Sequence, residues 1–294
     1  MKKLTLILLL TLSLVCNAAP GPQVARTFRD ISLVGYWHRE PYVWDEERFA
    51  PHVSWQAPDG GEYWLFEGFL FIEGSDWIHR RNLSLSPEGI SADKTVWQYQ
   101  LDLWLGPEGS VAALEKACSR AAERIGAPER KRGVVIGIPD AIMFEKFADK
   151  HSSTTYWGDG LDFARVEDRI KAYRWYIDSA RKLFAELGCR YLELSGFYIT
   201  SEGLDLPVDD GWNTQYKNWE RILPEVSAFC AAQGQGLYWI PYHLAPGYKH
   251  WKELGFTQAW MQPNWYWDHR QEGRHPFPKT LAALREADMS GMEL

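Results

Sequence analysis

Short, continuous apolar runs alternate with longer amphipathic segments along this chain, and this alternation constrains the fold more than any other feature of the sequence. The runs do not alternate between polar and apolar residues, so they are typical of strands that are buried on both faces of a parallel sheet. A seventh strand is expected to begin within Gly291 to Leu294. The six complete runs predict strands at Leu33 to Trp37, Trp64 to Ile72, Gly133 to Pro139, Tyr191 to Ile199, Leu237 to Tyr242 and Ala259 to Trp265.

The segments between these runs have the spacing of helices. From Val166 to Leu187 apolar residues recur at alternating steps of four and three, which predicts one continuous helix that ends at Gly188. A second helix is predicted from Trp219 to the glycines near Gly234, and a third starts at Ser110 as N-cap and runs to Gly126. The connection between Ile72 and Gly133 is longer than one crossover helix needs, so it is expected to carry an inserted segment from about Asn82 to Gly106.

Alternating strands and helices over 294 residues predict an α/β fold of the (β/α)₈ TIM-barrel type, which typically needs about 250 residues. No glycine-rich phosphate-binding fingerprint follows the first strand, which argues against a doubly wound dinucleotide-binding sheet. Only six strands and the start of a seventh fit before Leu294. The expected domain, residues 19–294, is therefore a barrel that is incomplete at its C-terminal end.

The N-terminus has the order of a secretory signal peptide. Lys2 and Lys3 precede an apolar run, and small residues follow it, so residues 1–18 are expected to be cleaved after Ala18. Cys16 raises a lipoprotein alternative, but Val15 stands where a small residue normally precedes a lipidated cysteine. The expected location is secreted, periplasmic or cell-surface, with no transmembrane span in the mature chain.

Charge and cysteine content exclude several functional classes. Acidic residues (39) exceed basic ones (32), giving a net charge of −7, so a broad basic surface for nucleic acid is not expected. The cysteines of the mature chain, Cys118, Cys189 and Cys230, have no metal-binding spacing. The segment Asp159 to Asp162 holds too few carboxylates for a calcium loop. We therefore predict no metal and no cofactor.

The active site of a (β/α)₈ barrel lies at the carboxyl ends of its strands. Nearly every segment that follows a predicted strand combines an aromatic ring with a hydrogen-bonding group, and 15% of the chain is aromatic. Such pairs suit the faces and hydroxyls of sugars, although ordinary packing is the alternative for any single ring. The expected sugar-contacting residues are Trp37, His38, Trp157, Tyr198, Tyr242, His243, Gln262, Asn264, Trp265 and Trp267.

Hydrolysis of a glycosidic bond needs a carboxylic acid and a second carboxylate. Glu202 follows the fourth strand among aromatic residues that would raise its pKa, so we expect it to be the general acid/base. Asp159 and Glu293 are weaker candidates for the partner, because the first reads equally as a turn residue and the second lies near the start of its strand. Glu193, near the start of the fourth strand, is expected in a buried ion pair, and Glu67 at the pocket floor or beside a buried arginine.

Several phrases of the sequence resemble a bacterial family known as domain of unknown function 4855. They are Trp175-Tyr176-Ile177-Asp178, Leu194-Ser195-Gly196-Phe197-Tyr198, Trp239-Ile240-Pro241-Tyr242, Ala245-Pro246-Gly247, Trp251-Lys252-Glu253-Leu254-Gly255-Phe256 and Gln262-Pro263-Asn264, in this order. The resemblance implies an exported barrel of the glycoside-hydrolase kind, found in bacteria that handle polysaccharides. It also implies that Glu202 is the glutamate after the Gly-Phe-Tyr strand, and that Gly291-Met292-Glu293 begins a later acidic strand.

These observations together predict a secreted glycoside hydrolase that acts on a poly- or oligosaccharide. The alternative is a non-catalytic carbohydrate-binding protein, or a structural protein of the envelope, on the same barrel. Catalysis requires a second carboxylate near Glu202, whereas binding requires only the aromatic residues around the cleft.

Overall fold

The fold is known from a computed structural model that describes residues 25–35, 44–84, 90–141, 154–206, 218–264 and 277–293. The expected signal peptide lies outside the described residues. The strands are β1 Ile31–Gly35, β2 Ser54–Gln56, β3 Glu62–Trp64, β4 Gly68–Ile72, β5 Ser75–Asp76, β6 Arg81–Asn82, β7 Ile90–Ser91, β8 Arg132–Ile138, β9 Leu192–Ile199, β10 Gly236–Trp239 and β11 Gln258–Ala259. The helices are α1 Glu46–Val53, α2 Lys94–Leu105, α3 Ser110–Ile125, α4 Val166–Leu187, α5 Trp219–Ala231, the 3₁₀ helix η3 Tyr248–His250 and α7 Phe277–Ser290.

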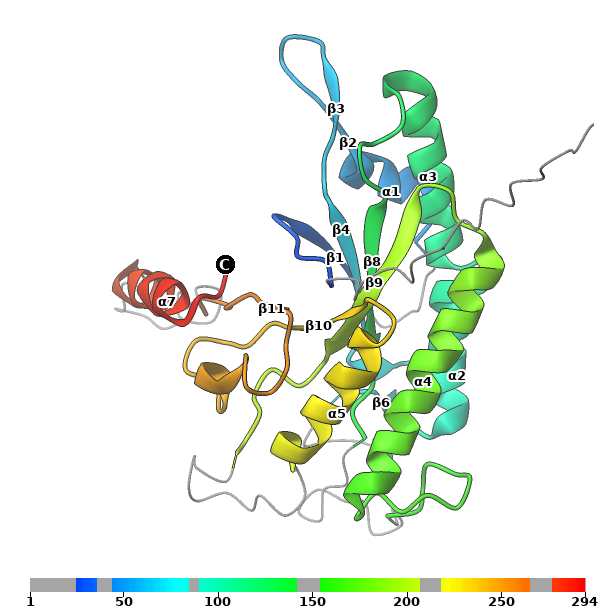
Figure 1. Cartoon of the computed structure of the whole chain (residues 1–294). Coiled ribbons are helices and arrows are strands. Elements are labelled where there is room, and N and C mark those ends of the chain that lie inside the picture. Colours follow the sequence, from blue (N-terminus) through cyan, green and yellow to red (C-terminus); the bar gives the residue numbers. More distant parts are fainter. Residues whose placement is uncertain are drawn as a thin grey trace, which may run out of the picture.

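A six-stranded parallel sheet organises the molecule, in the order β1-β4-β8-β9-β10-β11 (Figure 1). Each strand therefore pairs with the next main strand along the chain, as in a barrel wall. This confirms the parallel α/β sheet expected from the apolar runs. Within the described residues no strand joins the last one back to β1, so the structure is a curled half-barrel and not a closed (β/α)₈ barrel.

The expected seventh strand is represented by a single bridge. Glu293 pairs in parallel with Trp260, and its backbone N–H donates to the carbonyl of Ala259 at 3.0 Å. Gly291, at φ +65°, ends the turn that follows α7. The chain thus begins to extend the sheet beyond β11 at the position that the sequence predicts.

The predicted strand from Trp64 to Ile72 is wrong in its first half. Trp64 belongs to an antiparallel hairpin of β2 and β3, and the barrel strand β4 begins only at Gly68. Between them, the backbone N–H of Leu65 donates to the carbonyl of Val53, 2.9 Å away. A continuous apolar run cannot reveal such a break, because hairpin and buried strand use the same residue types.

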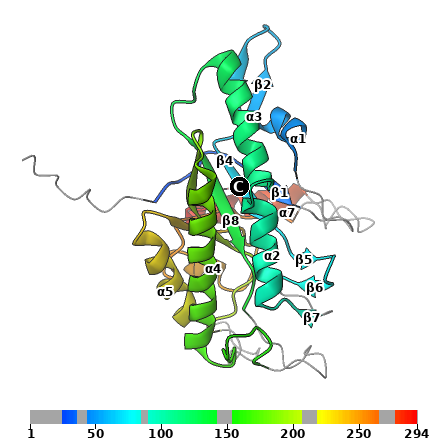
Figure 2. The ribbon, with the colours of Figure 1, turned by 90° about the vertical axis from the view of Figure 1, so that its right-hand side faces the viewer.

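Helices cover the convex face of the sheet (Figures 1 and 2). Helix α4 occupies the predicted range, and Gly188 ends it in the left-handed conformation at φ +61°. Helix α3 begins one position from the expected cap: Gly109 is its N-cap, and Ser110 Oγ instead accepts a hydrogen bond from the backbone N–H of Trp44. The predicted insertion, Asn82 to Gly106, contains β7 and helix α2, but the small sheet β5-β6-β7 to which β7 belongs already begins at Ser75.

The concave face of the sheet carries its own apolar cluster. Leu70, Tyr198, Tyr238 and Trp260 are buried there around Phe28, and the Tyr238 and Trp260 rings stack at 5.8 Å. The Gln258 side-chain amide accepts from the N–H and donates to the carbonyl of Phe28, both at 2.8 Å. The segment before β1 therefore closes the amino-terminal end of the half-barrel.

Two glutamates at this end have structural roles. The Glu193 carboxylate forms the expected ion pair, with the buried guanidinium of Arg26 at 2.8 Å, but the Glu193 side chain is itself 43% exposed, so the pair is not buried. Glu67 precedes β4 and pairs with the exposed Arg29, not with a buried arginine. No helix among the described residues is long and apolar enough to cross a membrane.

Candidate active site

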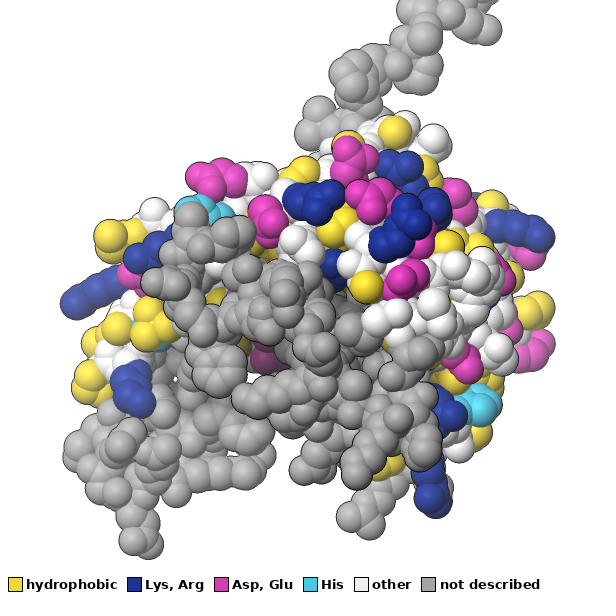
Figure 3. Space-filling model, turned by 90° about the horizontal axis from the view of Figure 1, so that it is seen from below, with side chains coloured by type: hydrophobic (Ala, Val, Ile, Leu, Met, Phe, Trp, Pro, Cys, Tyr) yellow, Lys and Arg dark blue, Asp and Glu magenta, His cyan; other side chains and the backbone are white. Residues whose placement is uncertain are grey.

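The carboxyl ends of the parallel strands carry a row of acidic residues. Glu73, Asp140 and Glu202 come within three residues of the ends of β4, β8 and β9, which are neighbours in the sheet. Figure 3 looks onto this end of the molecule and shows an acidic side chain in a recess near the middle of the face. The expected active-site edge is thus acidic along three adjacent strands.

Strand register places Glu202 on the concave face. Tyr198 and Tyr238 are level with each other and point into the concave cluster, and Tyr242 is level with Gln262. Because side chains alternate along a strand, Glu202, Tyr242 and Gln262 project from this same face, four residues beyond the buried layer. The structure therefore brings these three sequence-predicted residues together.

The contacts of Glu202 confirm that arrangement. Its carboxylate is exposed and accepts a hydrogen bond at 3.0 Å from Gln262 Nε2, which also donates to the Ile240 carbonyl at 3.1 Å. The half-buried Tyr242 hydroxyl is close enough that, after burial, the charge of Glu202 raises its pKa. The glutamate is thus held by an anchored amide while it remains open to solvent.

The end of β9 is tied to both neighbouring strands. Thr200 Oγ1 donates to the carbonyl of Ile138 at 2.7 Å, and Trp239 Nε1 donates to the carbonyl of Ser201 at 2.7 Å. All four residues are buried. Glu202 directly follows Ser201, so the hydrogen bonds to β8 and β10 fix the position of the backbone from which Glu202 extends.

Asp140 is a buried carboxylate next to this position. Only 9% of the residue is exposed, and its Oδ2 accepts a hydrogen bond from the buried Ser201 hydroxyl at 2.9 Å. Burial raises the pKa of the Tyr198 hydroxyl above its usual value, and the charges of Glu202 and Asp140 raise it further. Burial and Asp140 likewise raise the pKa of Tyr173, whose oxygen accepts from the Ala141 N–H at 3.0 Å.

Glu73 and Asp76, two further carboxylates near this end, serve the turn that follows β4. Glu73 Oε1 accepts from the backbone N–H groups of Gly74 and Ser75 at 2.9 and 3.2 Å. Asp76 Oδ2 accepts from the backbone N–H of His79 at 2.9 Å and lies 2.6 Å from its Nδ1. These contacts give both residues a structural role.

Two expected sugar platforms are core residues in the structure. Trp157 is 2% exposed, with its ring centroid 5.5 Å from that of Trp97 and 5.4 Å from that of Trp175. Tyr198 is 1% exposed beneath Glu202. Helix α2, part of the predicted insertion, supplies Trp97, and the Trp97 ring covers Trp157. The sequence did not predict this contact. Neither ring presents a face to a ligand in this structure.

The two proposed partners of Glu202 lie in different surroundings. Asp159 sits in an exposed turn at φ +53° and forms an ion pair with Lys94. Glu293 is level with Trp260, two residues before the level of Gln262, so it lies deeper than Glu202 along the strand direction. Neither has a recorded contact with Glu202.

The remaining predicted residues divide into two groups. His243 and Asn264 extend the pairing of β10 and β11, since the His243 N–H donates to the Gln262 carbonyl at 2.9 Å. Asn264 adopts φ +57°, and its Nδ2 approaches the His243 carbonyl at 3.5 Å. Trp37, His38, Trp265 and Trp267 lie outside the described residues.

Sequence reasoning did not select Asp140, although the same rule that selected Glu202 applies to it. Asp140 follows the third predicted strand directly, but nothing in the sequence shows that Ser201 would hold its carboxylate. Among the described residues no group of three or more His, Cys, Asp and Glu side chains could hold a metal ion.

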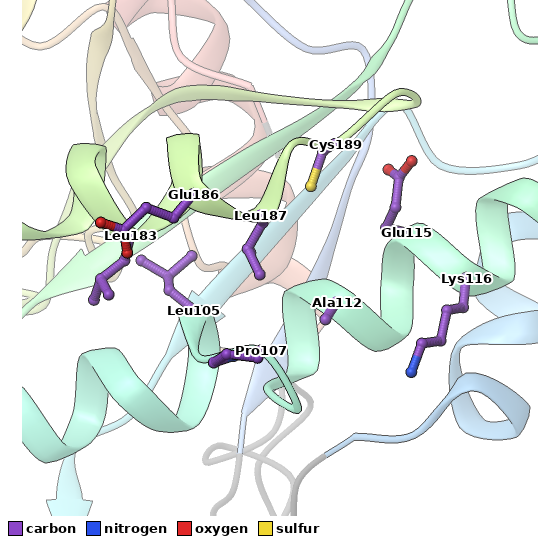
Figure 4. A pocket seen from close by; sticks show the side chains of 9 residues that line it. All are labelled: Leu105, Pro107, Ala112, Glu115, Lys116, Leu183, Glu186, Leu187 and Cys189. Atoms are coloured by element: carbon purple, nitrogen blue, oxygen red, sulfur yellow. The ribbon is translucent and has the colours of Figure 1, made fainter.

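A pocket of about 370 Å³ lies away from this site, on the helical side (Figure 4). Leu105, Pro107 and Ala112 line one wall, and Leu187 and Cys189 line another. Cys189 directly precedes the amino end of β9, which places the pocket at the opposite end of the strands from Glu202. We assign it no role in the candidate site.

Comparison with known proteins places the chain in a family. No curated protein matches the sequence. Among solved structures, the catalytic domain 2 of Group II chitinase from Ostrinia furnacalis aligns with 14% identity and a TM-score of 0.40, over 90% of this chain and 61% of that one. This similarity is too low to bear on function. Residues 30–294 match the family described as Domain of unknown function (DUF4855), and the chain therefore belongs to that family.

Proposed function

We propose that this domain hydrolyses glycosidic bonds of a poly- or oligosaccharide, with Glu202 as general acid/base. The observation that carries the proposal is an exposed glutamate at the carboxyl end of the fourth strand, held by Gln262. A second carboxylate, Asp140, follows the neighbouring strand β8 and accepts a hydrogen bond from Ser201, the residue before Glu202. Paired carboxyl groups at the strand ends are the chemical requirement for this reaction.

In the proposed reaction Glu202 donates its proton to the leaving glycosidic oxygen as the bond from that oxygen to the anomeric carbon breaks. Deprotonated Glu202 then takes a proton from the water whose oxygen bonds to the anomeric carbon. Gln262 orients the carboxyl group by its hydrogen bond to Oε1. Asp140 supplies negative charge that stabilises the positive charge developing on the sugar ring. The Ser201 hydroxyl holds that carboxylate in place.

Asp140 replaces the sequence-predicted partners as our first choice for the second carboxylate. It ends the strand next to that of Glu202, and its carboxylate accepts a hydrogen bond from Ser201, which directly precedes Glu202. Asp159 is neutralised by Lys94, and Glu293 lies deeper in the half-barrel. Both remain predictions of the sequence with less geometric support.

We further propose that the protein acts outside the cytoplasm, after removal of residues 1–18, where polymeric glycans are available. Tyr242, His243, Gln262 and Asn264 then contribute the polar side of a sugar-binding cleft. Trp37, His38, Trp265 and Trp267 stay predicted sugar contacts.

The test measures release of reducing ends from a panel of chitin, cellulose, xylan and their oligosaccharides. Glu202→Gln should lower turnover at least about 100-fold on a substrate with a poor leaving group, because an amide cannot donate the proton. Glu225→Gln is the matched control, because Glu225 is also an exposed glutamate but lies on helix α5, and this change should leave turnover unchanged. Glycan binding without hydrolysis by the unmodified protein would favour the non-catalytic alternative.

A further inference from the structure

The hairpin β2–β3 carries two large aromatic rings on its outward face. Trp55 and Tyr63 are directly paired across the strands, and their rings are 6.4 Å apart with 33° between the planes. They are 50% and 53% exposed, whereas most other tryptophans in the part of the chain that the structure describes are buried or half-buried, with Trp77 as an exception at 46%. Leu65, two residues after Tyr63, adds a third exposed apolar side chain. We call Trp55, Tyr63 and Leu65 the hairpin platform.

The opposite face of the hairpin is fastened to the end of α3. The Glu62 carboxylate accepts from Arg124 Nε and from the Ser54 hydroxyl, the latter at 2.6 Å. Trp64 Nε1 donates to the carbonyl of Gly126 at 3.1 Å, and the guanidinium of Arg132 lies 5.1 Å from the Trp64 ring. The two outward rings therefore stand on a rigid support, which reduces the entropy lost when a ligand binds.

The loop of the hairpin shapes one ring surface. A Cβ atom at Gly61 would come within 2.7 Å of the Tyr63 hydroxyl oxygen, so the Tyr63 ring packs closely against the backbone there. Asp59, in the loop of the hairpin, is exposed and offers hydrogen-bonding oxygens. A flat apolar face bordered by polar groups matches the apolar face and equatorial hydroxyls of a pyranose ring.

We propose that the hairpin platform is a second carbohydrate-binding site, which holds a polysaccharide chain away from the candidate active site. The patch of three apolar side chains favours a glycan over a protein partner, since a stable protein interface buries roughly 800 Å² per partner from 20–30 residues. The hairpin precedes the amino end of β4, so the platform lies at the opposite end of the strands from Glu202 (Figure 1). Only the class of the ligand, a polysaccharide, rests on the proposed function. The hairpin platform itself rests on the exposed rings and their support.

The experiment measures co-sedimentation of the whole chain with insoluble chitin, cellulose and xylan, in the Glu202→Gln background so that the polymer is not consumed. Trp55→Ala and Tyr63→Ala should each weaken binding about five- to tenfold, and the double variant more. Trp55→Phe should retain most of the binding because it keeps a ring. Trp77→Ala is the matched control, since Trp77 is 46% exposed on a different hairpin.

Retention on none of these polymers, or equal retention of Trp55→Ala and the parent, would overturn the proposal. An equal loss in Trp77→Ala would also overturn it, because binding would then reflect exposed aromatic surface in general. Self-association that Trp55→Ala abolishes, seen by sedimentation velocity, would assign the platform to a second copy of the chain instead. If Glu202→Gln stays active while Trp55→Ala loses polymer binding, the proposed function fails and the binding site stands.

Discussion

Replacement of Gly196 by alanine tests the closest backbone contact in the parallel sheet. Gly196 lies in β9 at φ +156°, beside an irregularity in the pairing of β8 and β9. A Cβ atom there would stand 2.1 Å from the carbonyl oxygen of Gly236 in β10. That oxygen belongs to the backbone of a buried strand, so the strands themselves must move.

The cost follows from this geometry. An ordinary contact begins near 3.4 Å, so the methyl group would have to displace β10 by about 1.3 Å. Overpacking of this kind costs about 1–3 kcal/mol, and the unfavourable φ adds about 1 kcal/mol. We expect Gly196→Ala to lower the free energy of unfolding by about 2–4 kcal/mol, or the Tm by roughly 3–7 °C.

Gly188→Ala separates the two contributions. Gly188 has φ +61°, but a Cβ atom there meets nothing within 4 Å, so only the backbone conformation is penalised, by about 1 kcal/mol. Urea unfolding followed by tryptophan fluorescence gives both free energies if the m-values agree. Equal destabilisation by the two variants would refute the argument that the approach of β9 and β10 requires glycine at position 196.

Two further predictions concern charged groups. Hydrogen bonds from Arg124 and then Ser54 lower the pKa of Glu62 from 4.5 to about 2, so its stabilising contribution is complete above pH 4.5 and is lost as the pH falls toward 2. The Tm difference between the unmodified protein and Glu62→Gln, measured by calorimetry, should accordingly be constant above pH 5 and shrink below pH 4.5; a constant difference down to pH 2 would contradict this. Ser201→Ala removes the hydroxyl that donates to Asp140 and should cost about 1.5–3 kcal/mol in urea unfolding. Turnover should fall in the same variant while the fold is retained; unchanged turnover would argue against a role of Asp140 in catalysis.

The parts of the fold that depend on local periodicity were predictable from the sequence. Helix α4 has the bounds that its apolar spacing and Gly188 predict, because a helix stripe and its cap are set within a few turns of the chain. The order of the strands was predicted for the same reason, but some bounds were wrong. The strand β11 is Gln258–Ala259 where Ala259 to Trp265 was expected, and a run such as Trp64 to Ile72 cannot show where a hairpin ends and a buried strand begins.

The candidate site was only partly predictable. That Glu202 follows the fourth strand is a local fact, and parallel strands bring their carboxyl ends to one edge, so its neighbourhood with Tyr242 and Gln262 could be expected. The sequence by itself thus determined the type of sheet, the edge that carries the acids and the first catalytic candidate. Only the tertiary structure decided that Trp157 is buried and that Asp140 stands beside Ser201, because burial and side-chain contacts depend on what distant segments, such as α2 and the neighbouring strand, place against each residue.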